Sequence, residues 1–389
     1  MVQKSLLELR KFVAPEFVFG EGSAALVGRY ARNLGAERVL LVTDPGVIEA
    51  GWVDAATDSL REYGHKVTLF SDVSANPRDH ESMAGAEIYR RNDCNAIVAV
   101  GGGSPMDCAK AIGIAVTNDR HVLEFEGVDN VARPGPPLIC LPTTSGSSAD
   151  VSQFAIILDS ARKVKIAIVS KAVVPDASLL DPALTATMSA ELTANTGLDA
   201  LTHAIEAYVS NASSPVTDLF ALEAVRFIHA HLVRAIHKPL DMDARAGMQL
   251  GSLYAGLAFS NAILGAVHAL SHSLGGLLDL PHGKCNAILL DHVIAHNFQA
   301  APERYSAVGT ALGADIMPGM DLEEQREAVL EAVRTFKCEA GVTESLASLG
   351  VSREDLDGLA QFALADPCMA TNPSTLTREE VVEIYAQAL

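Results

Sequence analysis

The sequence is short of positive charge and has no long apolar run. Its 29 Lys and Arg residues stand against 48 Asp and Glu residues, which gives a formal net charge of −19. That balance argues against a surface that binds nucleic acid or an anionic membrane. No apolar run approaches the ~20 residues that a membrane-spanning helix needs. We therefore expect neither a nucleic-acid partner nor a membrane partner.

Closely spaced cysteine pairs, an apolar leader and internal repeats are also missing. The six cysteines are scattered and form no CxxC pair: Cys94, Cys108, Cys140, Cys285, Cys338 and Cys368. Such scatter is typical of reduced thiols in the cytoplasm. The first residues, MVQKSLLELRKF, carry charges where a signal peptide is apolar. The sequence therefore predicts a cytoplasmic location.

The chain is long and apolar enough for two domains, since 49% of its 389 residues are hydrophobic. Apolar runs at 38–43, 66–70, 96–100 and 138–142 alternate with helical stretches, after a short edge segment at 12–20. This alternation predicts a parallel α/β sheet with a Rossmann-like build. Beyond about Asp181 helical periodicity replaces the strand signals. We expect an α/β dinucleotide-binding domain over residues 1–185 and an all-helical domain with the metal and catalytic residues over 186–389.

A glycine-rich turn, Gly101-Gly102-Gly103-Ser104, lies between a predicted buried strand and a helix that opens with Pro105. Glycines let backbone N–H groups approach an anion, and the helix N-terminus adds a favourable dipole. The pattern predicts a pyrophosphate cradle, with a simple tight turn as the alternative. It is not the G-x-G-x-x-G fingerprint of the common dinucleotide folds.

Two other strand ends carry polar residues. Asp44 ends the first predicted βα strand, where a carboxylate can bond the ribose hydroxyls of NAD and repel the 2′-phosphate of NADP. Its alternative role is to form the Asp-Pro-Gly turn. Thr143, Thr144 and Ser147 form a hydroxyl-rich loop after the strand at 138–142. They could bond a phosphate or the nicotinamide amide, or cap a turn.

The helical half contains two i, i+4 pairs of potential metal ligands. Asp199 and His203 form one pair and His268 and His272 the other, while His282 follows behind a proline. Residues four apart lie on one helix face, so each pair can aim two side chains at one point. Imidazoles and a carboxylate suit a divalent transition metal such as iron or zinc. The alternative is a set of hydrogen-bonded pairs, but the surrounding residues are apolar and buried imidazoles need partners.

These motifs together resemble the iron-containing (group III) alcohol dehydrogenases over essentially the whole chain. The matching stretches are GGGSPMD, PTTSGS, TGLDALTHAIEAYVS, GAVHALSHSLGG with PHG, and DPCMATNP. The resemblance implies a nucleotide-binding α/β domain, a helical domain, and a metal held by Asp199, His203, His268 and His282. It implies that His272 lies near the metal as a proton relay or nicotinamide contact. The run PTTSGSSAD departs from the family's PTTAGTGSE, with Asp150 in place of a longer acid.

The same resemblance implies NAD(H) as cofactor and Fe²⁺ as metal, with Zn²⁺ as the alternative, and a homo-oligomer. The cofactor contacts that it implies are Asp44, Asn76, Gly102, Gly103, Ser104, Asp107, Thr143, Thr144, Ser152 and Lys165.

The expected function is interconversion of a primary alcohol and its aldehyde by hydride transfer, with the metal polarising the substrate oxygen. One alternative is a dehydroquinate-synthase-like lyase or cyclase that uses metal and NAD. It would need a cluster of basic residues for a phosphate-bearing substrate, and Lys284 is the nearest candidate. Another alternative is a non-catalytic sensor that keeps the fold.

Overall fold

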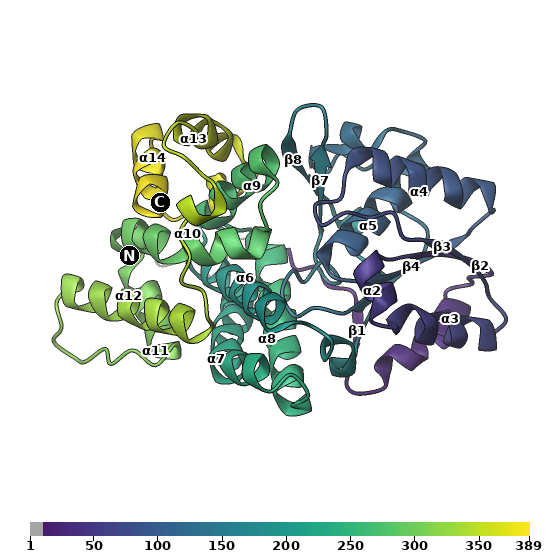
Figure 1. Cartoon of the computed structure of the whole chain (residues 1–389), viewed down its shortest axis with the longest axis horizontal. Coiled ribbons are helices and arrows are strands. Elements are labelled where there is room, and N and C mark those ends of the chain that lie inside the picture. The colour runs from purple at the N-terminus through teal and green to yellow at the C-terminus, as the bar shows by residue number, and fades with distance from the viewer. Residues whose placement is uncertain (1–10) are drawn as a thin grey trace.

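The computed structural model describes residues 11–389, which form a sheet-containing half and a helical half (Figure 1). The first half is built on a six-stranded sheet in the order β1-β9-β6-β4-β2-β3. Every neighbouring pair in it is parallel. Its strands are β1 (Glu16–Phe19), β2 (Arg38–Val42), β3 (Lys66–Phe70), β4 (Ala96–Gly101), β6 (Leu138–Pro142) and β9 (Ala177–Leu180). The predicted parallel α/β fold is confirmed, and β1 lies at the sheet edge, as expected for residues 12–20.

Helices cover both faces of this sheet, which explains its unbroken apolar strands. Val39 and Leu41 of β2 pack in one cluster with α1 (Val27–Asn33) and α3 (Trp52–Glu62). Leu40 and Val42 point to the other face and pack with α4 (Asp79–Arg91) and α5 (Gly103–Asn118). A strand buried on both faces has no polar face, so its sequence reads as a continuous apolar run.

Strand β9 and a second, three-stranded sheet were not predicted from the sequence. This sheet has the order β5-β8-β7, from β5 (Gly127–Val128), β7 (Phe154–Asp159) and β8 (Val164–Val169), with β7 and β8 antiparallel. The helical stretch between the apolar runs at 38–43 and 66–70 is two helices, α2 (Pro45–Glu49) and α3, because Gly51 between them adopts a left-handed conformation with φ 82°. The helix after the glycine turn begins at Gly103, before Pro105.

The second half consists of helices; among the residues that the structure describes, no strand follows Leu180. Its central helix is α6 (Ala190–Val209). Ser189 caps the N-terminus of this helix, because its hydroxyl accepts a hydrogen bond from the backbone N–H of Leu192. The other helices are α7 (Pro215–His237), α8 (Met242–Ala262), α9 (Ala266–Leu278), α10 (His282–Asn297), α11 (Pro302–Ala311), α12 (Leu322–Glu339), α13 (Leu356–Ala365) and α14 (Arg378–Gln387). The fold class is thus as predicted, whereas the domain boundary near residue 185 stays a prediction.

The two halves approach closely where glycines replace side chains. A Cβ atom built on Gly146, in the loop after β6, would lie 2.7 Å from the backbone oxygen of Thr196 in α6. One built on Gly276 of α9 would lie 2.9 Å from the backbone oxygen of Lys163, just before β8. Any larger residue would push the backbones apart. These glycines therefore allow the helical half to contact the hydroxyl-rich loop and the β7–β8 hairpin directly.

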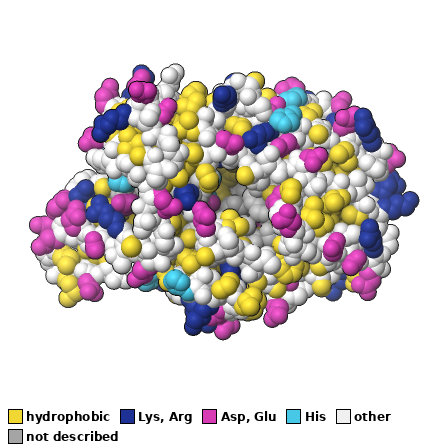
Figure 2. Space-filling model, viewed as in Figure 1, with side chains coloured by type: hydrophobic (Ala, Val, Ile, Leu, Met, Phe, Trp, Pro, Cys, Tyr) yellow, Lys and Arg dark blue, Asp and Glu magenta, His cyan; other side chains and the backbone are white. Residues whose placement is uncertain are grey.

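Acidic side chains are scattered over both halves on the face seen in Figure 2, in line with the net charge of −19. None of the helices within residues 11–389 is by itself long and apolar enough to cross a membrane. Helices α8 and α9 meet those criteria only when taken together, and they are bent by 97° at the break between them.

Candidate active site

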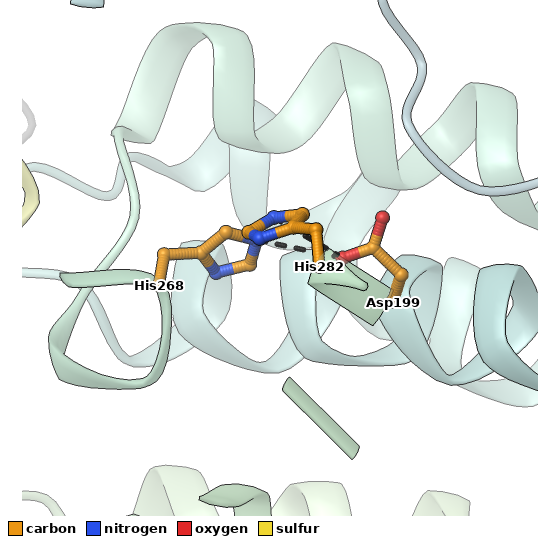
Figure 3. A group of neighbouring side chains, drawn as sticks. All are labelled: Asp199, His268 and His282. Carbon is orange, nitrogen blue, oxygen red and sulfur yellow. Dashed lines mark ion pairs between the residues drawn. The ribbon is translucent and has the colours of Figure 1, made fainter. Parts of the chain in front are cut away.

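Helices α6, α9 and α10 bring the imidazoles of three predicted ligands around the buried carboxylate of the fourth, Asp199. Its Oδ1 atom lies 3.6 Å from Nε2 of His268, 3.8 Å from Nε2 of His282 and 3.9 Å from Nε2 of His203. Figure 3 shows Asp199, His268 and His282 pointing toward one another from their separate helices. His203 stacks on His268 with 4.5 Å between ring centroids.

The donor set fits a divalent metal ion. Imidazole nitrogens and carboxylate oxygens bind Zn²⁺ at about 2.0–2.2 Å, so two ligands of one ion lie within about 4.2 Å of each other. All three nitrogen-to-Oδ1 distances meet that limit. Asp199, His268 and His282 also form a compact group in which the ligand atoms lie within 4.8 Å of one another. A single small ion can therefore contact Asp199, His268 and His282 at once, whereas the predicted ligand His203 lies outside this compact group.

The far nitrogen of each imidazole is held by a second group. Nδ1 of His268 donates to Oε2 of Glu206 over 2.6 Å, and Nδ1 of His203 donates to the backbone oxygen of Gly146 over 3.2 Å. Nδ1 of His282 lies 3.0 Å from Oγ of Ser271, whose hydroxyl itself donates to the His282 backbone oxygen. Since Nδ1 of each ring is engaged in this way, each Nε2 atom faces Asp199, as in metal sites.

Glu206 and Ser271 were missed by the sequence analysis. Glu206 lies seven residues after Asp199, two helical turns along the same face of α6, and this spacing was the available signal. Its second oxygen accepts the backbone N–H of Val267 over 2.7 Å. It therefore fixes both the ring of His268 and the start of α9.

The burial of the site sets its charges. Burial would raise the pKa of Asp199, but the neighbouring histidines outweigh it and hold the pKa far below its ordinary value. Burial lowers the pKa of His203 to about 4 and that of His282 well below its usual range. For His268 burial acts in the same direction, but Glu206 and Asp199 outweigh it and raise its pKa to about 9. His203 and His282 are thus neutral at pH 7, whereas His268 has to release its proton when an ion binds.

His272 lies beside this group, paired with Asp366. Its ring stacks on His282 at 5.2 Å between centroids, and its Nδ1 lies 2.8 Å from Oδ2 of Asp366. The other oxygen of Asp366 accepts the backbone N–H of Cys368 over 2.8 Å. Burial raises the pKa of the Cys368 thiol well above its usual range, so the thiol is protonated in the metal-free protein. This arrangement leaves Nε2 of His272 to exchange a proton. Asp366 was not among the site residues predicted from the sequence.

The glycine turn and the hydroxyl-rich loop lie together at the carboxyl edge of the sheet. Gly102 is the residue before α5, and a Cβ atom built on it would lie 3.2 Å from the side chain of Thr144. One built on Gly103 would lie 2.9 Å from Cβ of Ser147. The N-terminus of α5 therefore opens beside the loop after β6, which carries Thr143 and Thr144. The hydroxyl of Ser104 donates to the backbone oxygen of Ala75 over 2.5 Å.

Asp44 follows β2 at the same edge, and it caps a helix. Its Oδ1 accepts a hydrogen bond from the backbone N–H of Val47 over 3.0 Å at the start of α2. Asp44 therefore has the local turn-forming role that was the alternative to ribose binding. A cavity of about 470 Å³ lies alongside, lined by Pro45, Ser71, Asp72, Val73, Ser74, His80, Glu81 and Ala84. In parallel sheets such as this one, nucleotides bind outside the carboxyl ends of the strands.

The remaining predicted cofactor residues are partly or fully buried. Asp107 accepts the backbone N–H of Ile156 over 3.2 Å, and burial raises its pKa to about 6. The hydroxyl of Ser152 is bonded to Nζ of the buried Lys110 over 3.3 Å. Burial lowers the pKa of Lys165, which lies against Gly275 of α9.

Asn76 is bonded across the two halves. Its amide donates to Oδ1 of Asp279 over 2.6 Å, and NH2 of Arg78 lies 3.1 Å from Oδ2 of the same carboxylate. Asp279 ends α9 in a left-handed conformation with φ 53°. It therefore links a predicted cofactor residue to the loop that leads to His282.

Comparison with known proteins places both halves in one family. Residues 14–182 match the family model described as iron-containing alcohol dehydrogenase. Residues 193–389 match the model described as the C-terminal part of the Fe-containing alcohol dehydrogenase family.

Similar proteins match over nearly their whole length. A 1,3-propanediol dehydrogenase of Citrobacter freundii is 40% identical over 372 residues, covering 95% of this chain and 96% of the relative. An NAD-dependent methanol dehydrogenase of Bacillus methanolicus is 35% identical over 378 residues, covering 97% and 99%. A crystal structure of a 1,3-propanediol oxidoreductase superposes with a TM-score of 0.95 at 38% identity, covering 98% of this chain and 100% of that one.

Proposed function

Because the chain belongs to the iron-containing alcohol dehydrogenase family, we propose that the carboxylate and three imidazoles gathered around Oδ1 of Asp199 hold its iron(II) ion. The protein is an NAD(H)-linked oxidoreductase that interconverts an alcohol and its aldehyde. The observation that carries the site assignment is the convergence of three Nε2 atoms on one buried oxygen, with each Nδ1 held by another group. When bound, iron supplies a Lewis acid that polarises the substrate oxygen, and NAD(H) supplies the hydride chemistry.

The chain's own groups orient the reactants and move the proton. The backbone N–H groups of Gly103 and Ser104 open the N-terminus of α5, which suits the cofactor pyrophosphate, and Asp44 suits its ribose. His272 holds or releases the substrate proton at Nε2, since Asp366 engages its Nδ1. The glycine contacts between the halves bring the loop after β6 against α6, so both sites face one region.

The remaining cofactor contacts are proposed on the same basis. They are Asn76, Gly102, Asp107, Thr143, Thr144, Ser152 and Lys165. Their support is that Gly102 and Thr144 lie side by side, that Asn76 follows the cavity-lining Ser74 by two residues, and that Lys165 packs against Gly275 of α9.

A small primary alcohol is the proposed substrate class, because two of the relatives are named for 1,3-propanediol and methanol. The lyase or cyclase alternative loses support, since Nζ of Lys284 lies 2.9 Å from a Glu191 oxygen and 3.0 Å from a Glu344 oxygen. A cation engaged by two carboxylates does not offer free positive charge to a phosphate-bearing substrate.

The test is turnover with defined metal content. Protein purified without oxygen and loaded with Fe²⁺ should reduce NAD⁺ with a panel of C1–C4 alcohols and oxidise NADH with the matching aldehydes. His268→Ala should lose the bound metal and nearly all activity, because a missing ligand loosens the rest of the set. Full metal occupancy in that variant would remove His268 from the ligand set, and absence of turnover with every pair would refute the substrate class.

The assembly and location are also proposals. We propose a homo-oligomer, to be tested by light scattering, and a cytoplasmic location. The latter is supported by the six cysteines, all of which are free thiols and five of which are buried.

A further inference from the structure

One more side chain reaches the centre of the ligand group, and neither the sequence analysis nor the family resemblance assigned it a role. Asn286 lies on α10 one turn after His282, so both side chains project from the same helix face. It is fully buried. Its neighbours inside the site are the atoms that would bind the metal.

The amide nitrogen of Asn286 contacts three of those atoms. Nδ2 donates to Oδ1 of Asp199 over 2.7 Å. It also lies 3.1 Å from Nε2 of His268 and 3.3 Å from Nε2 of His282. The shortest contact is to the same oxygen on which the three imidazoles converge.

The other end of the amide shows that this is not an ordinary core asparagine. Oδ1 of Asn286 is buried and has no hydrogen-bond partner among residues 11–389. A buried amide without its full set of bonds is destabilising, so a residue chosen only for packing or core bonding would satisfy both ends. By contrast, Asn297 on the same helix has both its amide nitrogen and its amide oxygen bonded, to Asn372 and Ser374.

We propose that Asn286 is a positioning residue of the metal site, which acts through Asp199. Its NH₂ group holds the ligating carboxylate oxygen at the point where the imidazole Nε2 atoms meet. This inference rests on the proposed function, because it takes Asp199 and the three histidines as the ligands. Groups that orient metal ligands typically change metal affinity by ~10–100-fold when removed.

Two variants separate this role from a packing role. Asn286→Ala removes the hydrogen bond to Asp199, so the Kd for Fe²⁺ or Zn²⁺ should rise ~10–100-fold. Asn286→Asp keeps the shape but puts a second carboxylate against Oδ1 of Asp199. Like charges repel in the buried metal-free site and a divalent ion relieves that repulsion. The rise in Tm on adding metal should therefore be smaller than in the wild type for the Ala variant and larger for the Asp variant.

The measurements are Kd by chelator competition and Tm with and without metal, under anaerobic conditions for iron. Asn297→Ala is the matched control, a buried asparagine on the same helix that contacts no proposed ligand; it should lower both Tm values and leave Kd unchanged. The proposal would be overturned if both Asn286 variants bound metal with the same Kd as the wild type and showed the same rise in Tm on adding metal. If instead His268→Ala retained its metal, the ligand assignment itself would fail, so the two failures are distinguishable.

Discussion

Nδ1 of His272 lies 2.8 Å from Oδ2 of Asp366, although 94 residues separate them in the chain. Burial would raise the pKa of Asp366, but the charge of His272 and its hydrogen bond outweigh that effect and lower it. The carboxylate therefore stays ionised and fixes which ring nitrogen of His272 carries the proton. A catalytic histidine oriented in this way is a common arrangement for proton transfer.

The first prediction concerns this pair. His272→Ala should keep the metal but lower kcat by ~10²–10⁴-fold, the usual contribution of a general acid or base. Asp366→Asn should also keep the metal and lower kcat by less, because an amide oxygen can still accept the Nδ1 proton. Metal content and kcat are measured on the same samples. Loss of metal from His272→Ala would make His272 a ligand and end its proton role.

The second prediction concerns the choice of cofactor. A 2′-phosphate near Asp44 would bring like charges together, at a cost of several kcal/mol when partly buried. We expect the wild type to prefer NAD(H) strongly over NADP(H), and Asp44→Gly to narrow the preference while weakening NAD binding. Glycine at the start of α2 costs only a few tenths of a kcal/mol as a cap, so folding should survive. The measurement is the ratio of kcat/KM for NAD(H) to that for NADP(H), in the wild type and in Asp44→Gly. The same ratio in both proteins would show that Asp44 acts only as a helix cap.

The third prediction concerns pH and the partly buried Asp107. Burial raises its pKa to about 6 in the folded protein, from an ordinary value of 3.8. The folded state therefore holds this proton more tightly, and the group's contribution to stability is present below pH 4 and lost as the pH rises through 6. Asp107→Asn cannot ionise, so its free energy of unfolding relative to the wild type should increase between pH 4 and pH 7, by at most ~3 kcal/mol. Denaturant curves at several pH values test this, and a pH-independent difference would contradict it.

The fourth prediction concerns the contact of Asp279 with Asn76 and Arg78 across the two halves. Asp279→Ala loses both contacts and places alanine at φ 53°, where a Cβ atom costs roughly 1–2 kcal/mol. Asp279→Gly loses the contacts but relieves the backbone, and Asp279→Asn keeps a side-chain oxygen for Asn76. Tm should fall most for Ala, less for Gly and least for Asn. Equal values for Ala and Gly would show that the left-handed backbone carries no cost here.

Much of the fold could be predicted from the sequence, because parallel strands buried on both faces must be apolar throughout. The runs that became β2, β4 and β6 stood out for that reason, and so did the glycine turn after β4. The hairpin of β7 and β8 was missed, although its strands are also apolar. A short apolar run does not by itself distinguish a strand from a buried helix segment. The break at Gly51 was missed because a left-handed glycine inside a helical pattern follows from backbone geometry, not composition.

By itself the sequence determined the family, because the motifs are specific, and the resemblance to that family predicted the four ligands. Only the tertiary structure decided that Glu206, Ser271 and the backbone of Gly146 hold the three imidazoles. It alone paired Asp366 with His272 and placed the Asn286 amide on Asp199. The physical reason is that buried polar groups find partners through the packing of separate helices. Helical periodicity fixes which way a side chain faces, but not which side chain from another helix it meets.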